Sequence, residues 1–195
     1  MTEPLIHSDS VGDPTRFLSL ATLRAAYKAM PRPDRDVGSV CLIVQRGDGG
    51  VRTCLQRADV TLTSGIPGDA WGRKQRTSMN GQLTVMERGV GELVANGQPL
   101  TLFGDNLIVD LDLTAANLAV GTTLRMGSAL LEVTPKPHNG CSKYQARFGA
   151  DALKFSAAKA TRALNLRGVY MRVTEPGTIA VGDAIRVVHR PSIAS

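Results

Sequence analysis

The sequence is short of several residue types, and each shortage excludes a class of protein. Only 4% of its 195 residues are aromatic, and three are cysteines, Cys41, Cys54 and Cys141. An odd number of cysteines in a chain that opens without a basic, apolar leader argues against a disulfide framework. No apolar run reaches the roughly 18 residues that a bilayer span needs. We therefore expect a soluble, cytoplasmic protein with no membrane partner.

The composition is that of a globular protein. Hydrophobic residues make up 43% and charged residues 21% of the chain, which excludes a disordered or fibrous protein. The length predicts one domain with an appended element. The chain has 23 Lys and Arg against 17 Asp and Glu, a formal net charge of +6, which favours an anionic partner. Arg73, Lys74 and Arg76 form the one dense basic cluster, and no nucleic-acid motif accompanies it. A small phosphate-bearing molecule fits this charge better than nucleic acid does.

An amphipathic helix is predicted within an N-terminal extension, residues 1–36. Asp13 can cap it and Pro14 suits its first position. Apolar residues then recur every three or four positions, at Phe17, Leu20, Leu23, Tyr27 and Met30. We expect this helix to pack on the domain, and a helix that binds a partner is the alternative.

Short strands dominate the rest of the chain. Val40 to Val44, a turn at Gly47 to Gly50, and Val51 to Gln56 predict a hairpin. Further strands are expected over 107–109, 128–134 and 167–175. Two segments, 118–126 and 179–187, each combine an apolar approach, a glycine turn and a strand. This pattern predicts a mainly β fold, a distorted and partly closed antiparallel β-barrel with peripheral helices.

Three further helices are predicted at the periphery. Leu83, Met86, Val90, Leu93 and Val94 are spaced as in a helix that Gly97 would end. Residues 142–148 suggest one or two helical turns stopped by Gly149. Asp151 can cap a last helix that reaches about Leu164.

Cys141 is the residue that most strongly indicates chemistry. It follows a loop that contains Pro135, Pro137 and Gly140, and it is predicted to open a helix, where free N–H groups favour an anion. His138, Lys143 and Arg147 are close in sequence and would stabilise a thiolate further, which is the form that attacks electrophiles and binds soft metals. A buried structural cysteine is the alternative. Cys41 and Cys54 lie in the predicted hairpin and are expected to be inert core thiols.

Other sites are less well supported by the pattern. A hydrolytic dyad of Cys141 and His138 needs a contact that spacing cannot show, and no zinc-ligand spacing is present. Asp69, in a glycine-rich turn, is either an acceptor for nearby amides or a residue that positions a ligand. Asp105 and Asn106 either cap a turn or present a polar edge to a bound heterocycle.

Taken in order, these pieces resemble one family, the MOSC domains, named for the C-terminal domain of molybdenum cofactor sulfurases. The resemblance covers residues 37–190, leaves a short tail at 191–195, and is similar in size to stand-alone bacterial MOSC proteins. The pieces that carry it are Gly38 to Arg46, Gly65-Ile66-Pro67-Gly68-Asp69-Ala70-Trp71-Gly72, Gln82 to Met86, Gly104-Asp105-Asn106-Leu107, Gly140-Cys141 with Arg147-Phe148-Gly149, Arg172 to Gly177, and Val181-Gly182-Asp183.

The resemblance implies a β-barrel with a cleft that binds the molybdenum cofactor. Cys141 would be its metal ligand and catalytic residue, or else a persulfide carrier. His138, Asn139, Gly140 and Lys143 would line the pocket, with Asp105, Asn106 and Asp69 opposite, and Arg73, Lys74 or Arg147 would pair with the pterin phosphate. No pyridoxal phosphate is expected, because that chemistry belongs to a separate domain of the larger sulfurases.

Two departures from the family pattern are visible. Only a helix precedes the domain, whereas some members carry an additional N-terminal barrel with basic residues that help to hold the cofactor. Trp71 stands where members often place a histidine. Three functions therefore stay open: a small oxidoreductase that removes oxygen from N-hydroxylated compounds, a persulfide sulfur carrier, and a non-catalytic binding module. A redox or sulfur-donor protein would be the partner of the first two.

Overall fold

Strands dominate residues 6–73 and 78–192, which the computed structural model describes. The larger elements, in chain order, are β1 (Ile6–His7), α1 (Leu20–Ala29), β2 (Val37–Arg46), β3 (Val51–Leu55), β4 (Arg57–Val60), β5 (Leu83–Glu87), α2 (Arg88–Ala95), β6 (Leu107–Asp110), β7 (Thr123–Met126), β8 (Ala129–Val133), α3 (Ser142–Phe148), α4 (Ala150–Ala157), β9 (Val169–Glu175), β10 (Gly177–Ala180) and β11 (Ala184–His189).

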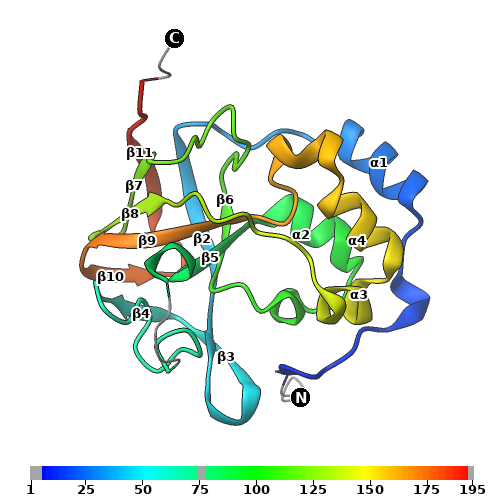
Figure 1. The fold of residues 1–195 in the computed structure, drawn as a ribbon, viewed down its shortest axis with the longest axis horizontal. Helices are drawn as coiled ribbons and strands as arrows, with labels where there is room; N and C mark the ends of the chain where they lie inside the picture. The colour runs from blue at the N-terminus through cyan, green and yellow to red at the C-terminus, as the bar shows by residue number, and fades with distance from the viewer. Residues whose placement is uncertain (1–5, 74–77, 193–195) are drawn as a thin grey trace.

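Seven of these strands close into a barrel. Their order is β2, β11, β7, β8, β9, β5 and β6, and β6 pairs with β2 again to complete the ring. The pair β5–β6 is parallel, and the other neighbouring pairs of the ring are antiparallel. Figure 1 shows the barrel on one side of the molecule and the four α-helices on the other. This arrangement confirms the mainly β, barrel-like fold with peripheral helices.

Two smaller β elements extend the ring. β3 pairs with β2 as the predicted hairpin, and β1 adds to its outer edge. β4 and β10 form a separate antiparallel ribbon. The predicted glycine turns are also present: Gly121 precedes β7 and Gly182 precedes β11, each at φ +89°, a left-handed conformation that glycine adopts without steric cost.

The barrel interior is filled by alternate residues of its strands. On β8, Ala129, Leu131 and Val133 are buried, and the residues between them are less so. Leu124 and Met126 of β7 join the same cluster. This period of two is what a sheet with one face on a core requires. Burial of these side chains contributes roughly 1.5–3 kcal/mol each to folding.

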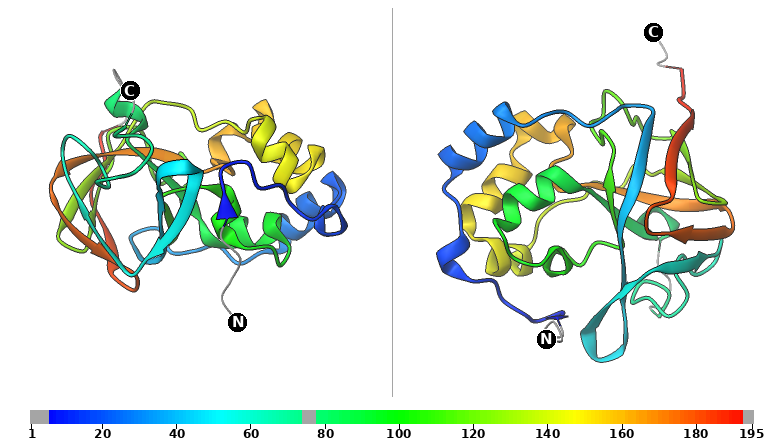
Figure 2. Two further views of the ribbon diagram at one scale, coloured as in Figure 1. Left: turned by 90° about the horizontal axis from the view of Figure 1, so that it is seen from below. Right: turned by 180° about the vertical axis from the view of Figure 1, so that it is seen from behind.

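The helices pack against one outer side of the barrel (Figure 2). Leu23 of α1 and Phe155 of α4 belong to a second cluster, together with Met86 of β5 and Ile108 of β6. Phe103 stacks on Phe148 of α3, with ring centroids 4.1 Å apart. β5 and β6 are therefore covered on both faces. No helix in the described part of the chain is long and apolar enough to cross a membrane.

The helix predicted from Leu83 to Gly97 is wrong in its first half. Residues 83–87 are strand β5, and the helix proper, α2, begins at Arg88. All five residues of β5 are buried, so the strand lacks the alternation that would mark it in the sequence. Asn96, in the left-handed region at φ 47°, ends the helix one residue before Gly97.

Two predicted caps also act differently. Asp13 caps a single 3-10 turn, Pro14–Arg16, and α1 begins later, capped by Ser19. Asp151 lies in the first turn of α4, whose N-cap is Gly149, and its carboxylate accepts a hydrogen bond from the backbone N–H of Leu20 instead. The α-helix ends at Ala157, and a 3-10 segment, Lys159–Leu164, follows.

The two hairpin cysteines differ from each other. Cys41 is half-buried and packs against the cluster beneath the helices. Cys54, predicted to be a core thiol, is exposed, because it lies on β3 outside the closed ring, where one face meets solvent. The prediction for Cys54 is corrected accordingly.

Candidate functional site

The loop that carries Cys141 connects β8 to α3, as the sequence predicts. Cys141 is the N-cap of α3, with extended backbone (φ −133°, ψ 179°) and no capping bond from its side chain. Its side chain is exposed, as are Asn139 and Lys143. Gly140 packs tightly against α4, because a Cβ built on it would lie 2.4 Å from Cδ1 of Leu153. The thiol is thus held at the surface at the start of a helix.

Asp69 and Asn106, both predicted site residues, meet in a buried hydrogen-bond network. Asp69 is 1% exposed and Asn106 is fully buried. Arg46 donates to the Asp69 carboxylate through Nε and Nη2, the shorter contact being 2.6 Å. Nη2 of Arg46 also donates to Oδ1 of Asn106 at 3.0 Å. Burial raises the pKa of Asp69, but the hydrogen bonds and charge of Arg46 outweigh it and hold the pKa below its usual value.

Backbone groups and the Thr84 hydroxyl complete the hydrogen bonds of this network. Nδ2 of Asn106 donates to the carbonyl of Val44 and to Asp69, and its Oδ1 accepts from Thr84. The backbone N–H of Trp71 donates to Asp69 at 3.0 Å. Asp69 and Asn106 therefore tie the loop after β4 to β2 and β5. In the structure they join these three elements and fix the guanidinium of Arg46.

A second buried cluster contains Asp105, His138 and Arg167. Arg167 Nη1 donates to Asp105 Oδ2 at 2.6 Å, and His138 Nε2 lies 3.6 Å from Asp105 Oδ1. The three side chains are 9% exposed or less. Burial, followed by the positive charges of Arg167, Arg46 and Lys136, holds the pKa of His138 well below 6.5, so the imidazole is neutral. Burial also raises the pKa of Asp105, against the charge of Arg167.

This cluster contains polar atoms without partners. Among the described residues, Asp105 Oδ1, His138 Nδ1 and Arg167 Nε are buried and make no hydrogen bond. His138 and Arg167 both border a small cavity of about 50 Å³. A space of this size is large enough for a water molecule, and a water there would donate to His138 Nδ1 and accept from Arg167 Nε.

Tyr170 of β9 lies between the two clusters. Its ring centroid is 4.5 Å from that of His138, and Nζ of Lys136 lies 4.5 Å above the same ring. Burial raises the pKa of Tyr170, and the negative charge of Asp105 raises it further, while Arg167 and Arg46 lower it. The phenol therefore stays protonated at neutral pH.

A cavity of about 200 Å³ opens beside Tyr170. The described residues that line it are Arg46, Ala70, Trp71, Ser78, Gly81, Lys136 and Tyr170. Two of these described residues are cationic and none is acidic. The side chain of Arg46 is 25% exposed and reaches this space from its network. We call this cavity the basic cleft. It is suited to an anion that also offers a flat surface to an aromatic ring.

Two predicted phosphate-binding residues, Arg147 and Arg73, do not line the basic cleft. Arg147 is buried, and its guanidinium donates to the backbone carbonyls of Ser8 and Ser10, which fixes the N-terminal segment. Arg73 donates to backbone carbonyls of Gly68, Arg46 and Gly47 and pairs with Asp48 at 3.2 Å. Lys74 lies outside the described residues. Burial lowers the pKa of Arg147 from its usual value.

Four residues of the site were not predicted from the sequence. They are Arg46 at the end of β2, Lys136 in the loop after β8, Arg167 in the turn before β9, and Tyr170 in β9. Lys136 lies in the proline-rich loop that was recognised, five positions before Cys141. Its position in that loop is the signal from which it could have been predicted. Arg46, Arg167 and Tyr170 come together only when the barrel closes.

Comparison with known proteins identifies the family. The MOSC domain profile matches residues 81–186, more than half of the chain, and includes Asp105, His138, Cys141 and Arg167. No curated protein sequence matches the chain.

Several solved structures share the fold. YuaD from Bacillus subtilis is 19% identical with a TM-score of 0.56, over 76% of this chain and 94% of YuaD. YiiM from Escherichia coli is 22% identical with a TM-score of 0.53, over 80% and 73%. YiiM from Geobacillus stearothermophilus is 20% identical with a TM-score of 0.50, over 82% and 76%. These similarities show a shared fold. The profile match over more than half of the sequence shows the family: the chain belongs to the MOSC domain family.

Proposed function

We propose that this MOSC protein binds an anionic molybdenum–pterin cofactor in the basic cleft, with Cys141 as the single protein ligand of the metal. One observation carries the proposal. The loop that ends at the exposed Cys141 also supplies Lys136, and Lys136 lines the basic cleft together with Arg46 and Tyr170. A soft donor and an anion site thus share one loop.

The donor chemistry fits a metal that brings most of its own ligands. No group of three or more His, Cys, Asp or Glu side chains in residues 6–73 and 78–192 could hold a bare metal ion. A single thiolate is sufficient for a molybdenum centre whose other soft ligands come from the pterin dithiolene. The exposure of Cys141 leaves room for that group.

The residues of the chain would bind and orient the cofactor. Arg46, which Asp69 holds in a fixed orientation, and Lys136, which lies above Tyr170, would pair with phosphate oxygens. Trp71 would give the pterin an aromatic surface. When bound, the cofactor would supply electron transfer. Tyr170, which keeps its proton, would donate a hydrogen bond at the edge of the cleft.

The proposed reaction is the reduction of an N-hydroxylated base. The N–O bond breaks, the substrate takes up an electron pair from a redox partner protein, and protons from water complete the amine and release the oxygen as water.

The exposure of Cys141 also favours a second candidate, a sulfur carrier. Its thiolate would attack the outer sulfur of a donor persulfide, form a new S–S bond and release the donor thiolate. Cys141 would then present the outer sulfur to an acceptor. In this function the basic cleft would serve only to dock the partner.

The test is to measure pterin, metal and intact mass on protein purified from a host that makes the cofactor. The variants are Cys141→Ser with Cys54→Ser as its control, and Lys136→Gln with Lys28→Gln as its control, since Cys54 and Lys28 are exposed and lie outside the basic cleft. Lys136→Gln should lower pterin content about tenfold, because one charge-assisted contact is lost. Cys141→Ser should lose the metal and retain part of the pterin.

The sulfur carrier predicts another result. Wild-type protein would carry an additional mass of about 32 Da, one sulfur atom, Cys141→Ser would lack it, and Lys136→Gln would keep it. Wild-type protein with neither pterin nor the added sulfur would contradict both chemical functions and leave a binding module.

A further inference from the structure

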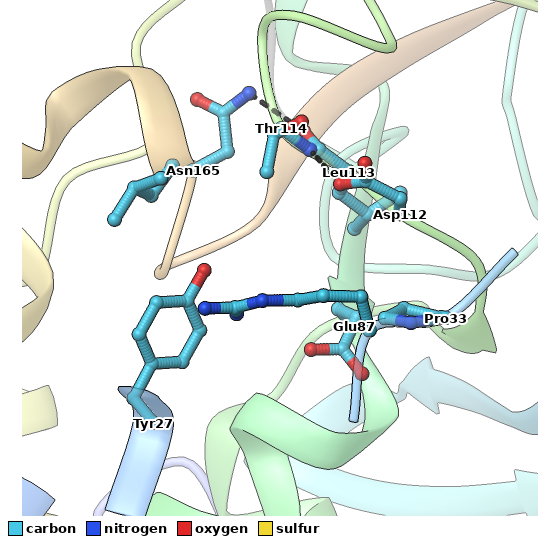
Figure 3. A pocket seen from close by; sticks show the side chains of 9 residues that line it. Tyr27, Pro33, Glu87, Asp112, Leu113, Thr114 and Asn165 are labelled. Atoms are coloured by element: carbon cyan, nitrogen blue, oxygen red, sulfur yellow. Dashed lines mark hydrogen bonds between the residues drawn. The ribbon is translucent and has the colours of Figure 1, made fainter. Parts of the chain in front are cut away.

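A second cavity, of about 250 Å³, lies on the helical side of the barrel and has no part in the proposed function (Figure 3). It is enclosed by α1, the linker to β2, the start of α2, the loop after β6 and the 3-10 segment before β9. The residues that line it are Tyr27, Arg32, Pro33, Glu87, Asp112, Leu113, Thr114, Leu164 and Asn165. We call it the Tyr27 cavity. It shares only Asn165 with the small cavity beside His138.

Two carboxylates border this cavity. Glu87, 8% exposed, caps α2 by accepting from the backbone N–H groups of Gly89 and Val90. Asp112 Oδ1 accepts from the backbone N–H of Thr114 at 2.8 Å. Among the residues the structure describes, neither carboxylate forms an ion pair. Each therefore has lone pairs left for a cation.

The chain itself places a planar cation in this cavity. Cζ of Arg32 lies 4.1 Å from the centre of the Tyr27 ring, a cation–π contact. Arg32 is exposed and stands between Pro31 and Pro33, which restrict the backbone that carries it. The face of the Tyr27 ring is thus occupied by a guanidinium of the chain itself. This contact shows that the ring can bind a group of that kind.

Other polar groups are directed into the same space. Figure 3 shows the hydroxyl of Tyr27 and the carboxylate of Glu87 projecting toward it, with Asn165 on the opposite side. Nδ2 of Asn165 donates to the carbonyl of Leu113 at 2.8 Å, which fixes the amide at the border of the cavity. A planar group with several N–H donors would meet acceptors around its edge and an aromatic ring on its face.

We propose that the Tyr27 cavity is a binding site for a small molecule with a guanidinium group, which replaces Arg32 on Tyr27. Because it is free of the linker that holds Arg32, this ligand can move deeper and pair with Asp112 and Glu87, which Arg32 does not pair with. A guanidinium matches this site better than an ammonium does, because it is planar, stacks on aromatic rings and donates in a fixed fork. The cavity is smaller than the roughly 300–1,000 Å³ of sites for drug-sized ligands, so the ligand is a small one.

The test is to measure, by isothermal titration calorimetry, the affinity of the full chain for three probes that share a butyl group and differ in their polar group. N-butylguanidinium is planar and charged, n-butylammonium is charged but not planar, and N-butylurea is planar but neutral. Arg32→Ala should bind N-butylguanidinium about tenfold more tightly than wild type, because an internal competitor is removed. The other two probes should bind that variant at least about tenfold more weakly.

Asp112→Asn in the Arg32→Ala background should weaken N-butylguanidinium about tenfold or more. The asparagine keeps an oxygen for the N–H of Thr114, so the loop is retained. Arg35→Ala is the control on the same linker, since Arg35 donates to the carbonyl of Ala116 and does not line the cavity. It should bind like wild type, and thermal melts should show that each variant is folded.

Nuclear Overhauser contacts between the butyl protons and the ring of Tyr27 should place the probe in the cavity. Equal affinity of Arg32→Ala for the three probes, no effect of Asp112→Asn, or equally tight binding by wild type would each overturn the proposal. These readouts do not involve Cys141 or a cofactor, so they are independent of the proposed function.

Discussion

His138 and Asp105 face each other inside the protein, with Nε2 of the imidazole 3.6 Å from Oδ1 of the carboxylate. One residue comes from the loop before α3 and the other from the turn before β6. His138 is kept neutral by burial and by three nearby cations, Arg167, Arg46 and Lys136. A buried neutral histidine makes the stability of the fold depend on pH.

We expect wild-type protein to lose stability as the pH falls from 7 to 5.5. The folded-state pKa of His138 lies well below 6.5, so the unfolded chain binds more protons than the folded chain in this window. The stabilising effect is present above about pH 6.5 and is lost as the pH falls toward the folded-state pKa. Urea unfolding should show a loss of about 1 kcal/mol that His138→Gln lacks. The same pH slope in both proteins would contradict a neutral buried His138.

The cysteines should differ in their rate of alkylation. Burial raises the pKa of the Cys41 thiol, so it should react most slowly near neutral pH. Cys141 and Cys54 are exposed, and Cys141 also begins a helix, where free N–H groups favour an anion. Peptide mass spectrometry after brief iodoacetamide treatment should show Cys141 labelled first, then Cys54, then Cys41. Labelling of Cys41 as fast as Cys141 would refute this order.

The barrel strands could be predicted because their signals are local. Alternation over Ala129, Leu131 and Val133 and the glycines before β7 and β11 lie within a few residues of each strand. β5 was misread as helix because neighbouring elements cover both of its faces, Leu83 packing in the barrel core and Met86 against the helices. Period alone cannot distinguish such a strand from a buried helix.

The site was predictable residue by residue and not as an arrangement. Asp105 and His138 were each selected from their own loop, but their proximity exists only once β6 and β8 belong to one ring. Arg167, in the turn before β9, and Tyr170, in β9, carry no local signature, since single basic or aromatic residues are common in turns and strands. The loop position of Cys141 and the cations near it in sequence indicated its importance, and the resemblance to the MOSC family added a role as metal ligand or persulfide carrier.

The network around Asp69 should be one of the most sensitive points of the fold. Its carboxylate is 2% exposed and binds Arg46, so Asp69→Asn leaves a partly buried guanidinium without its counter-charge. We expect a loss of about 2–4 kcal/mol in the free energy of unfolding, measured in urea. Asp110→Asn is the matched control, because Asp110 pairs with Arg88 at the surface, and it should cost less than about 1 kcal/mol. Equal losses would show that burial of Asp69 contributes nothing.

The position of Cys141 should depend on the contact between Gly140 and Leu153. A Cβ at position 140 would lie 2.4 Å from Cδ1 of Leu153 and 3.4 Å from the ring of Tyr144, so Gly140→Ala must displace the loop or the leucine. Such overpacking costs about 1–3 kcal/mol. Leu153→Ala alone should also destabilise α4, since it removes apolar contacts. In the double variant the new methyl group fits the space that the leucine leaves, so its loss should be smaller than the sum of the two single losses. Urea unfolding of the four proteins measures this coupling, and alkylation of Cys141 reports whether the loop has returned. Additive losses would mean that the loop does not rest on α4 at this contact, and that another feature holds the thiol in place.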